Sequence, residues 1–186
     1  ITATALLVRY LRWRGADVEY YIPHRVEDGY GLSKDGVTGL ADRGARLVIT
    51  CDCGVTAVEE VALARDLGLD VIVTDHHECG ADLPPGIAVL DPKREDCGYP
   101  DQNLAAVGVA FKLCEALEIS AGRGRDTLRR GLDLVALGTI ADLVPVTGEN
   151  RVLIRFGLDV LAGTRNAGLK ALLQRTQLDA IADRKL

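Results

Sequence analysis

The sequence predicts an α/β protein, with a parallel β-sheet flanked by helices and followed by a helical segment. Short, almost continuous apolar runs alternate with amphipathic runs in the first part of the chain, which is typical of strands buried on both faces. A glycine closely follows each of these amphipathic runs and acts as a helix stop signal. After residue 104 the apolar positions recur at helical spacing instead.

The first elements follow from local patterns. Residues 2–14 have apolar positions at helical spacing before Gly15, so they predict a helix. Residues 17–23 alternate between apolar and polar and predict a strand. After a glycine-rich loop, residues 33–43 predict a short helix that ends near Gly44.

The segments that follow predict the main strands of the sheet. Residues 45–54 and 70–75 are apolar runs that predict buried strands, and residues 56–67 predict the helix between them. Residues 87–92 predict a further short strand after a polar loop. Strands connected by helices in this way predict a parallel arrangement.

The second part of the chain predicts mainly helices. Helices are expected over residues 104–117, 125–137, 151–162 and 168–174. A short strand over residues 143–146 is the one alternative to a purely helical segment. We therefore assign residues 1–119 to the sheet part of the domain and residues 120–186 to its helical part and the start of a connection to a further domain.

Composition excludes several classes of protein. No apolar run approaches the ~18–20 residues of a membrane span, and no signal-peptide pattern is visible, so a cytoplasmic protein without a membrane partner is expected. The five cysteines favour reduced thiols, and the Cys51-x-Cys53 spacing is too short for a usual zinc knuckle. The net charge of −5 argues against a broad basic nucleic-acid footprint, but not against a site that holds phosphate through metal ions.

Residues with side chains that can bind metal or take part in catalysis follow two of the predicted strands. Asp52 comes directly after one buried run, and Asp75-His76-His77 follows the next. The ends of parallel strands share one edge of the sheet, and neighbouring strands are only ~5 Å apart, so these side chains are expected to face one point. Taken alone, Asp52 is also consistent with a turn or helix-capping residue.

Asp142 is the third candidate of this cluster. It ends a nearly uncharged run, so we expect an isolated carboxylate in apolar surroundings, which a metal ion would neutralise. Carboxylates with one imidazole suit manganese or magnesium better than a structural zinc ion. Such ions catalyse phosphoryl transfer.

These residues resemble the DHH phosphoesterase superfamily, which is named for the triplet present here at positions 75–77. The longer runs CDCGVTA, VIVTDHHECGADLPPGIAVLDPKREDCGYP, LAAVGVAFKL and LVALGTIADLVPVTGENRVLIRFGL extend the resemblance over nearly the whole chain. Within the superfamily they are similar to bacterial exonucleases that degrade single-stranded DNA from the 5′ end in DNA repair and recombination.

The resemblance implies roles for particular residues. Asp52 would bridge two manganese or magnesium ions, with His76 and Asp142 as further ligands. Asp75 would ligate a metal ion or orient His76, and His77 would position the scissile phosphate or stabilise its charge. Arg25, in front of a Gly-Tyr-Gly loop, is a candidate phosphate contact.

The resemblance also implies parts of a longer protein. The superfamily's first motif, an Asp-x-Asp cluster, precedes the pattern in which Ile1 lies, so this piece alone is expected to be inactive. A second catalytic-core domain and an oligonucleotide-binding barrel are expected elsewhere in the parent. Single-stranded DNA, a single-strand-binding protein and a helicase are the expected partners.

Three alternatives compete with this reading. One is a phosphodiesterase of the same superfamily that acts on cyclic dinucleotides, short oligonucleotides or pyrophosphate. Another is a non-catalytic scaffold in replication or repair, although the intact candidate ligands argue against it. An ordinary nucleotide-binding domain is disfavoured because neither a G-x-G-x-x-G turn nor a G-x₄-G-K-[ST] loop occurs.

Overall fold

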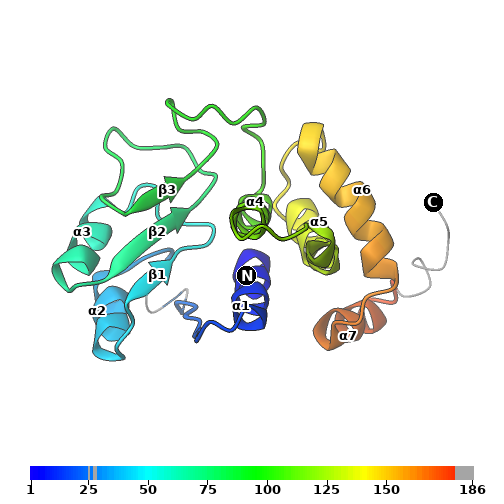
Figure 1. Cartoon of the computed structure of the whole chain (residues 1–186), viewed down its shortest axis with the longest axis horizontal. Helices are drawn as coiled ribbons and strands as arrows, with labels where there is room; N and C mark the ends of the chain where they lie inside the picture. The colour runs from blue at the N-terminus through cyan, green and yellow to red at the C-terminus, as the bar shows by residue number, and fades with distance from the viewer. Residues whose placement is uncertain (25, 27–28, 179–186) are drawn as a thin grey trace.

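A computed structural model describes residues 1–24, 26 and 29–178 of the chain (Figure 1). Its strands form one parallel sheet of order β1-β2-β3, so the predicted α/β class is confirmed. The strands are β1 (Leu47–Ile49), β2 (Asp70–Thr74) and β3 (Ala88–Leu90). The helices are α1 (Thr2–Trp13), α2 (Lys34–Asp42), α3 (Val58–Asp66), α4 (Ala106–Ser120), the 3₁₀ helix η1 (Asp126–Gly131), α5 (Leu132–Ala141), α6 (Gly148–Ala162) and α7 (Ala167–Arg175).

Helices cover both faces of the sheet. Figure 1 shows α2 and α3 on one side and α1 and α4 on the other, with α5, α6 and α7 stacked beyond α4. Each side has its own buried apolar cluster. The smaller one joins α2 and α3 to β1 and β2, whereas the larger one joins α1, α4 and α5. No helix of the described residues is both long and apolar enough to cross a bilayer.

The strand ends are aligned at one edge of the sheet. Hydrogen bonds continue the ladder past the assigned strands, from the Asp52 amide to the Thr74 carbonyl at 3.0 Å and from the Asp75 amide to the Leu90 carbonyl at 3.0 Å. The residues that follow β1, β2 and β3 are therefore held beside one another. This arrangement confirms that the first two candidate clusters lie on neighbouring parallel strands.

The expected strand over residues 17–23 is absent, so that prediction was wrong. The Val18 carbonyl accepts hydrogen bonds from the Arg12 side chain, at 2.6 and 3.0 Å, and not from a neighbouring strand. Tyr20 and Ile22 are 63% and 51% exposed. The alternating pattern is present, but no described strand pairs with it and no core buries its apolar face.

Two further predictions need correction. Residues 143–146 form no strand, because Leu143 has a left-handed backbone with φ of 59° that turns the chain. The expected helix over residues 125–137 is divided into η1 and α5 at Gly131, where an added Cβ would lie 2.6 Å from Leu6 Cδ1. The domain boundary at residue 119 falls in the last turn of α4 and stays a prediction.

Helices α5 and α6 pack closely at Gly157. A Cβ atom added there would lie 2.4 Å from the Leu132 carbonyl oxygen and 2.5 Å from Ala136 Cβ. Real side chains do not approach that closely, so glycine sets the spacing of the pair. This contact fixes α5, which carries Asp142 at its C-terminal end.

Candidate metal centre

A sharp turn after β1 presents Asp52 at the sheet edge. Asp52 itself has a left-handed backbone with φ of 66°, and Gly54 follows with φ of 111°. A Cβ on Gly54 would lie 3.1 Å from Thr50 Oγ1 and 3.3 Å from Val73 Cγ1. Left-handed backbone is uncommon for a residue other than glycine and is concentrated at functional sites.

His76 is the centre of the cluster. Its ring nitrogen Nε2 lies 3.2 Å from Asp52 Oδ1 and 3.4 Å from Asp142 Oδ2. The residue is only 8% exposed, yet Nε2 forms no hydrogen bond of normal geometry. A buried, unsatisfied nitrogen that faces two carboxylates indicates a shared ligand between them. One imidazole and two carboxylates fit a manganese or magnesium ion.

Asp75 is buried, and both of its carboxylate oxygens have hydrogen-bond partners. Its Oδ2 accepts a hydrogen bond from the Val55 amide at 2.9 Å. Its Oδ1 accepts from the His76 amide at 2.8 Å and contacts His77 Nδ1 at 2.6 Å. An ionised carboxylate only accepts, so the proton of the last bond is on Nδ1. Asp75 thus fixes the orientation of the His77 ring and ties the loop after β1 to the histidine pair.

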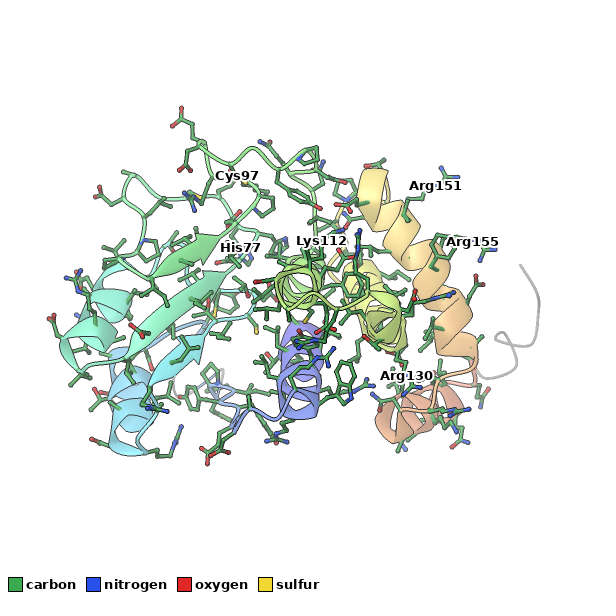
Figure 2. The ribbon with its side chains drawn as sticks, in the orientation of Figure 1. His77, Cys97, Lys112, Arg130, Arg151 and Arg155 are labelled. Carbon is green, nitrogen blue, oxygen red and sulfur yellow. The ribbon has the colours of Figure 1, made fainter. Side chains whose placement is uncertain are left out.

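His77 is half-exposed beside this cluster. Figure 2 places it where the sheet edge faces α4. Its ring centroid is 4.6 Å from that of His76. Ligand atoms of Asp52, His76 and His77 all lie within 4.8 Å of one another. His77 is therefore placed to contact either a bound ion or a group attached to that ion.

Asp142 has different surroundings from those expected. It caps the C-terminus of α5, and its side chain is 30% exposed, so the expectation of an enclosed carboxylate was wrong. Asp142 and Asp52 both border a cavity of about 280 Å³ between the first turns of α1 and α4 and the end of α5. The helix delivers the carboxylate to the cavity rim rather than into the core.

Sequence reasoning missed two residues at this edge. The Tyr30 hydroxyl donates to the Asp52 carbonyl at 2.5 Å, and its ring meets His77 edge-on at 6.3 Å. Burial and the nearby Asp52 raise the pKa of Tyr30 to about 12, so it remains a donor. The Gly-Tyr-Gly sequence around it was the available signal.

Asp91 is the other missed residue, and it follows β3 as Asp52 follows β1. It is 3% exposed; its Oδ1 accepts from the Lys93 amide at 2.8 Å, and its Oδ2 has no hydrogen-bond partner. Burial raises the pKa of this carboxyl group. Its place directly after the third strand was the available signal. The candidate phosphate contact Arg25 lies outside the described residues.

Metal affinity is expected to depend on pH through His76. Burial alone lowers the pKa of His76, but Asp52 and Asp142 outweigh it and hold the pKa above its ordinary 6.5. In the metal-free protein, the paired imidazolium therefore contributes stability fully below pH 6.5, and this contribution is lost as pH rises through the raised pKa. Manganese competes with that proton, so manganese affinity increases over the same range and then levels off. Manganese titrations below and above this pKa measure the trend. A manganese affinity that does not change with pH would contradict it.

Asp75→Asn is expected to lower manganese affinity by about 10–100-fold, the usual effect of losing a residue that orients metal ligands. The amide has a single acceptor oxygen in place of two, so the bonds to Val55, His76 and His77 cannot all persist. Calorimetric titration with manganese measures the effect. Asp82→Asn, in the exposed loop that follows, is the matched control. Equal affinities of the two variants contradict the assignment.

Comparison with known proteins places these residues in context. The profile of the DHH family, N-terminal domain, matches residues 1–139. The single-stranded-DNA-specific exonuclease RecJ of Bacillus subtilis is 46% identical over 174 residues. That match covers 94% of this chain but 21% of the relative, so the chain spans about a fifth of that relative's length.

Solved structures give the same result. The crystal structure of exonuclease RecJ bound to manganese superposes with a TM-score of 0.81 and 38% identity, covering 94% of this chain and 44% of that one. RecJ from Thermus thermophilus in complex with Mg²⁺ has a TM-score of 0.60 and 31% identity, covering 94% and 20%. The DHH resemblance predicted from the sequence motifs is confirmed.

Proposed function

This chain belongs to the DHH family, and we propose on that premise that it is part of the catalytic core of a metal-dependent exonuclease that degrades single-stranded DNA from the 5′ end. The observation that carries the proposal is the buried His76 Nε2, which faces Asp52 and Asp142 without a hydrogen bond. The relatives named for this activity support the choice of substrate.

Asp52, His76 and Asp142 hold the metal ion in this proposal. His76 Nε2 lies 3.2 Å from an Asp52 oxygen and 3.4 Å from an Asp142 oxygen. Asp52 also borders the cavity, so its carboxylate would be available to a second ion. Manganese or magnesium bound there supplies Lewis-acid chemistry for phosphodiester hydrolysis. RecJ structures similar to this chain have been solved bound to manganese and in complex with Mg²⁺.

His77 binds the phosphate in this proposal. Its Nδ1 is held by Asp75, so Nε2 is the ring nitrogen left to face an oxygen of the phosphate. Tyr30 keeps the Asp52 turn in place through its hydrogen bond to the Asp52 carbonyl. Arg25 remains a proposed phosphate contact.

The wider setting is part of the same proposal. The reaction would serve DNA repair and recombination in the cytoplasm, with a single-strand-binding protein and a helicase as partners. Residues 1–119 and 120–186 would be the sheet and helical parts of the DHH domain. Resemblance to the exonucleases supports these assignments, and the length of those relatives agrees with further domains in the parent protein.

The test is hydrolysis of a 5′-labelled single strand by the full-length protein with manganese. Release of labelled mononucleotides from the strand, with the matching duplex left intact, is the expected result. Cleavage of dinucleotides alone contradicts the exonuclease proposal and favours a small-substrate phosphodiesterase. Binding of a single strand without any hydrolysis favours a scaffold. Asp82→Asn is the control variant that keeps full activity.

A further inference from the structure

Four of the helices that the structure describes end in the same way. A left-handed glycine follows the last turn of α1, α2, α3 and α4; these are Gly15, Gly44, Gly68 and Gly122, with φ between 67° and 85°. In each case the next amide closes the end by a hydrogen bond to the carbonyl five residues earlier. The bonds are Ala16 to Leu11, Ala45 to Leu40, Leu69 to Ala64 and Arg123 to Glu118, at 2.9–3.2 Å. Glycine removes the steric cost, and the bond satisfies a terminal carbonyl.

Helix α5 also ends with a left-handed residue, but that residue is not glycine and the closing hydrogen bond is missing. The residue is Leu143, with φ of 59° and a side chain exposed to 90%. The closing bond would run from the Val144 amide to the Thr139 carbonyl, and it is not formed. Leu143 therefore carries the steric cost of a left-handed residue, and neither burial nor this bond offsets it.

Helix α7 shows what an ordinary left-handed end without glycine looks like. Gln177 follows it with φ of 57°, and the Leu178 amide closes the end on the Leu173 carbonyl at 3.0 Å. Among the described residues, the non-glycine positions with left-handed backbone are Asp52, Leu143 and Gln177. Asp52 faces His76, and Leu143 directly follows the other carboxylate that does so.

We propose that Leu143 is a positioning residue of the metal centre, whose left-handed backbone ends α5 at Asp142 and keeps that carboxylate on the ion. The turn leaves Asp142 as the cap residue with Oδ2 3.4 Å from His76 Nε2. Beyond it, the Pro145 carbonyl accepts from Asn150 Nδ2 at 3.1 Å, which anchors the departing chain on α6. This inference rests on the proposed metal centre and is independent of the DNA substrate.

The test compares substitutions at the ends of α5 and α7 in the full-length protein. Manganese titration measures metal affinity, and thermal unfolding measures stability. Leu143→Pro forbids the left-handed backbone and is expected to lower manganese affinity at least about 10-fold, as for a lost positioning group. Gln177→Pro damages the end of α7 in the same way and keeps affinity within about 3-fold. Leu143→Gly removes the steric cost, so it keeps manganese affinity and raises the Tm of the metal-free protein by roughly 2–4 °C.

Several outcomes would overturn the inference. A folded Leu143→Pro variant with wild-type manganese affinity would show that Asp142 needs no left-handed neighbour. Equal loss of affinity in Gln177→Pro would assign the effect to general destabilisation. If Leu143→Pro does not fold, an unchanged or lower Tm in Leu143→Gly rejects the proposal. A wild-type protein that binds no manganese would instead reject the metal centre itself.

Discussion

Alanine in place of His76 is expected to lower manganese affinity at least about 100-fold, beyond the usual loss for a residue that only orients ligands, and to abolish the proposed DNA hydrolysis. The imidazole places a nitrogen donor within 3.2 Å of Asp52 and 3.4 Å of Asp142. Without it, the two carboxylates face each other across an unfilled gap and repel one another. Calorimetric titration and the single-strand assay measure the two effects separately.

His77→Ala is the matched comparison, because the two rings are neighbours and differ in burial. If His77 contacts phosphate, its loss lowers the hydrolysis rate by about 10²–10³-fold and leaves manganese affinity within about 10-fold. Similar losses of affinity in both variants would make His77 a metal ligand. Unchanged affinity in His76→Ala would refute the proposed centre.

Gly157→Ala is expected to reduce the free energy of unfolding by about 1–3 kcal/mol, which is typical of overpacking a tight contact. The added methyl group would lie 2.4 Å from the Leu132 carbonyl oxygen. That oxygen belongs to the backbone of α5, so it cannot move aside as the end of a flexible side chain can. This cost exceeds the ~0.5–1 kcal/mol that alanine gains over glycine inside a helix. Urea unfolding measures the change.

Gly39→Ala in α2 is the control with the opposite expected sign. No atom lies within 4 Å of the added methyl group there, so only the helix preference remains and stability should rise by about 0.5–1 kcal/mol. A Gly157→Ala protein as stable as the wild type would show that α5 and α6 separate freely. In that case α5 would not hold Asp142 rigidly.

The sequence was informative wherever local pattern and burial agree. Buried parallel strands such as β2 are continuous apolar runs, and their ends share an edge by geometry, so Asp52 and His76 could be placed together in advance. Asp142 was a candidate because its acid is isolated in an apolar run, but only the resemblance to known motifs gave it a role beside Asp52 and His76. Helical periodicity predicts a helix, but it does not say against which strand edge that helix terminates.

The errors have a common physical origin. Residues 17–23 alternate as a strand does, but a strand exists only with a partner, and partners are a property of the whole fold. Asp142 follows an apolar run, but it lies at the end of α5 on the rim of a cavity and not in the core. Tyr30 was missed because its contact with the Asp52 turn depends on three-dimensional proximity. Asp91 was missed although its place directly after a predicted strand was a signal.

The bonds of Asp75 have a consequence for ion exchange and selectivity. One carboxylate fastens the turn after β1 to both histidines after β2, so the donor atoms are assembled when the chain folds and not when an ion arrives. A preorganised site spends little binding free energy on rearrangement. Exchange rates should then follow the rate at which each ion sheds its water, which makes manganese faster to enter than magnesium. Discrimination between the two ions should come from their preference for the imidazole donor, because the scaffold does not reshape itself for either.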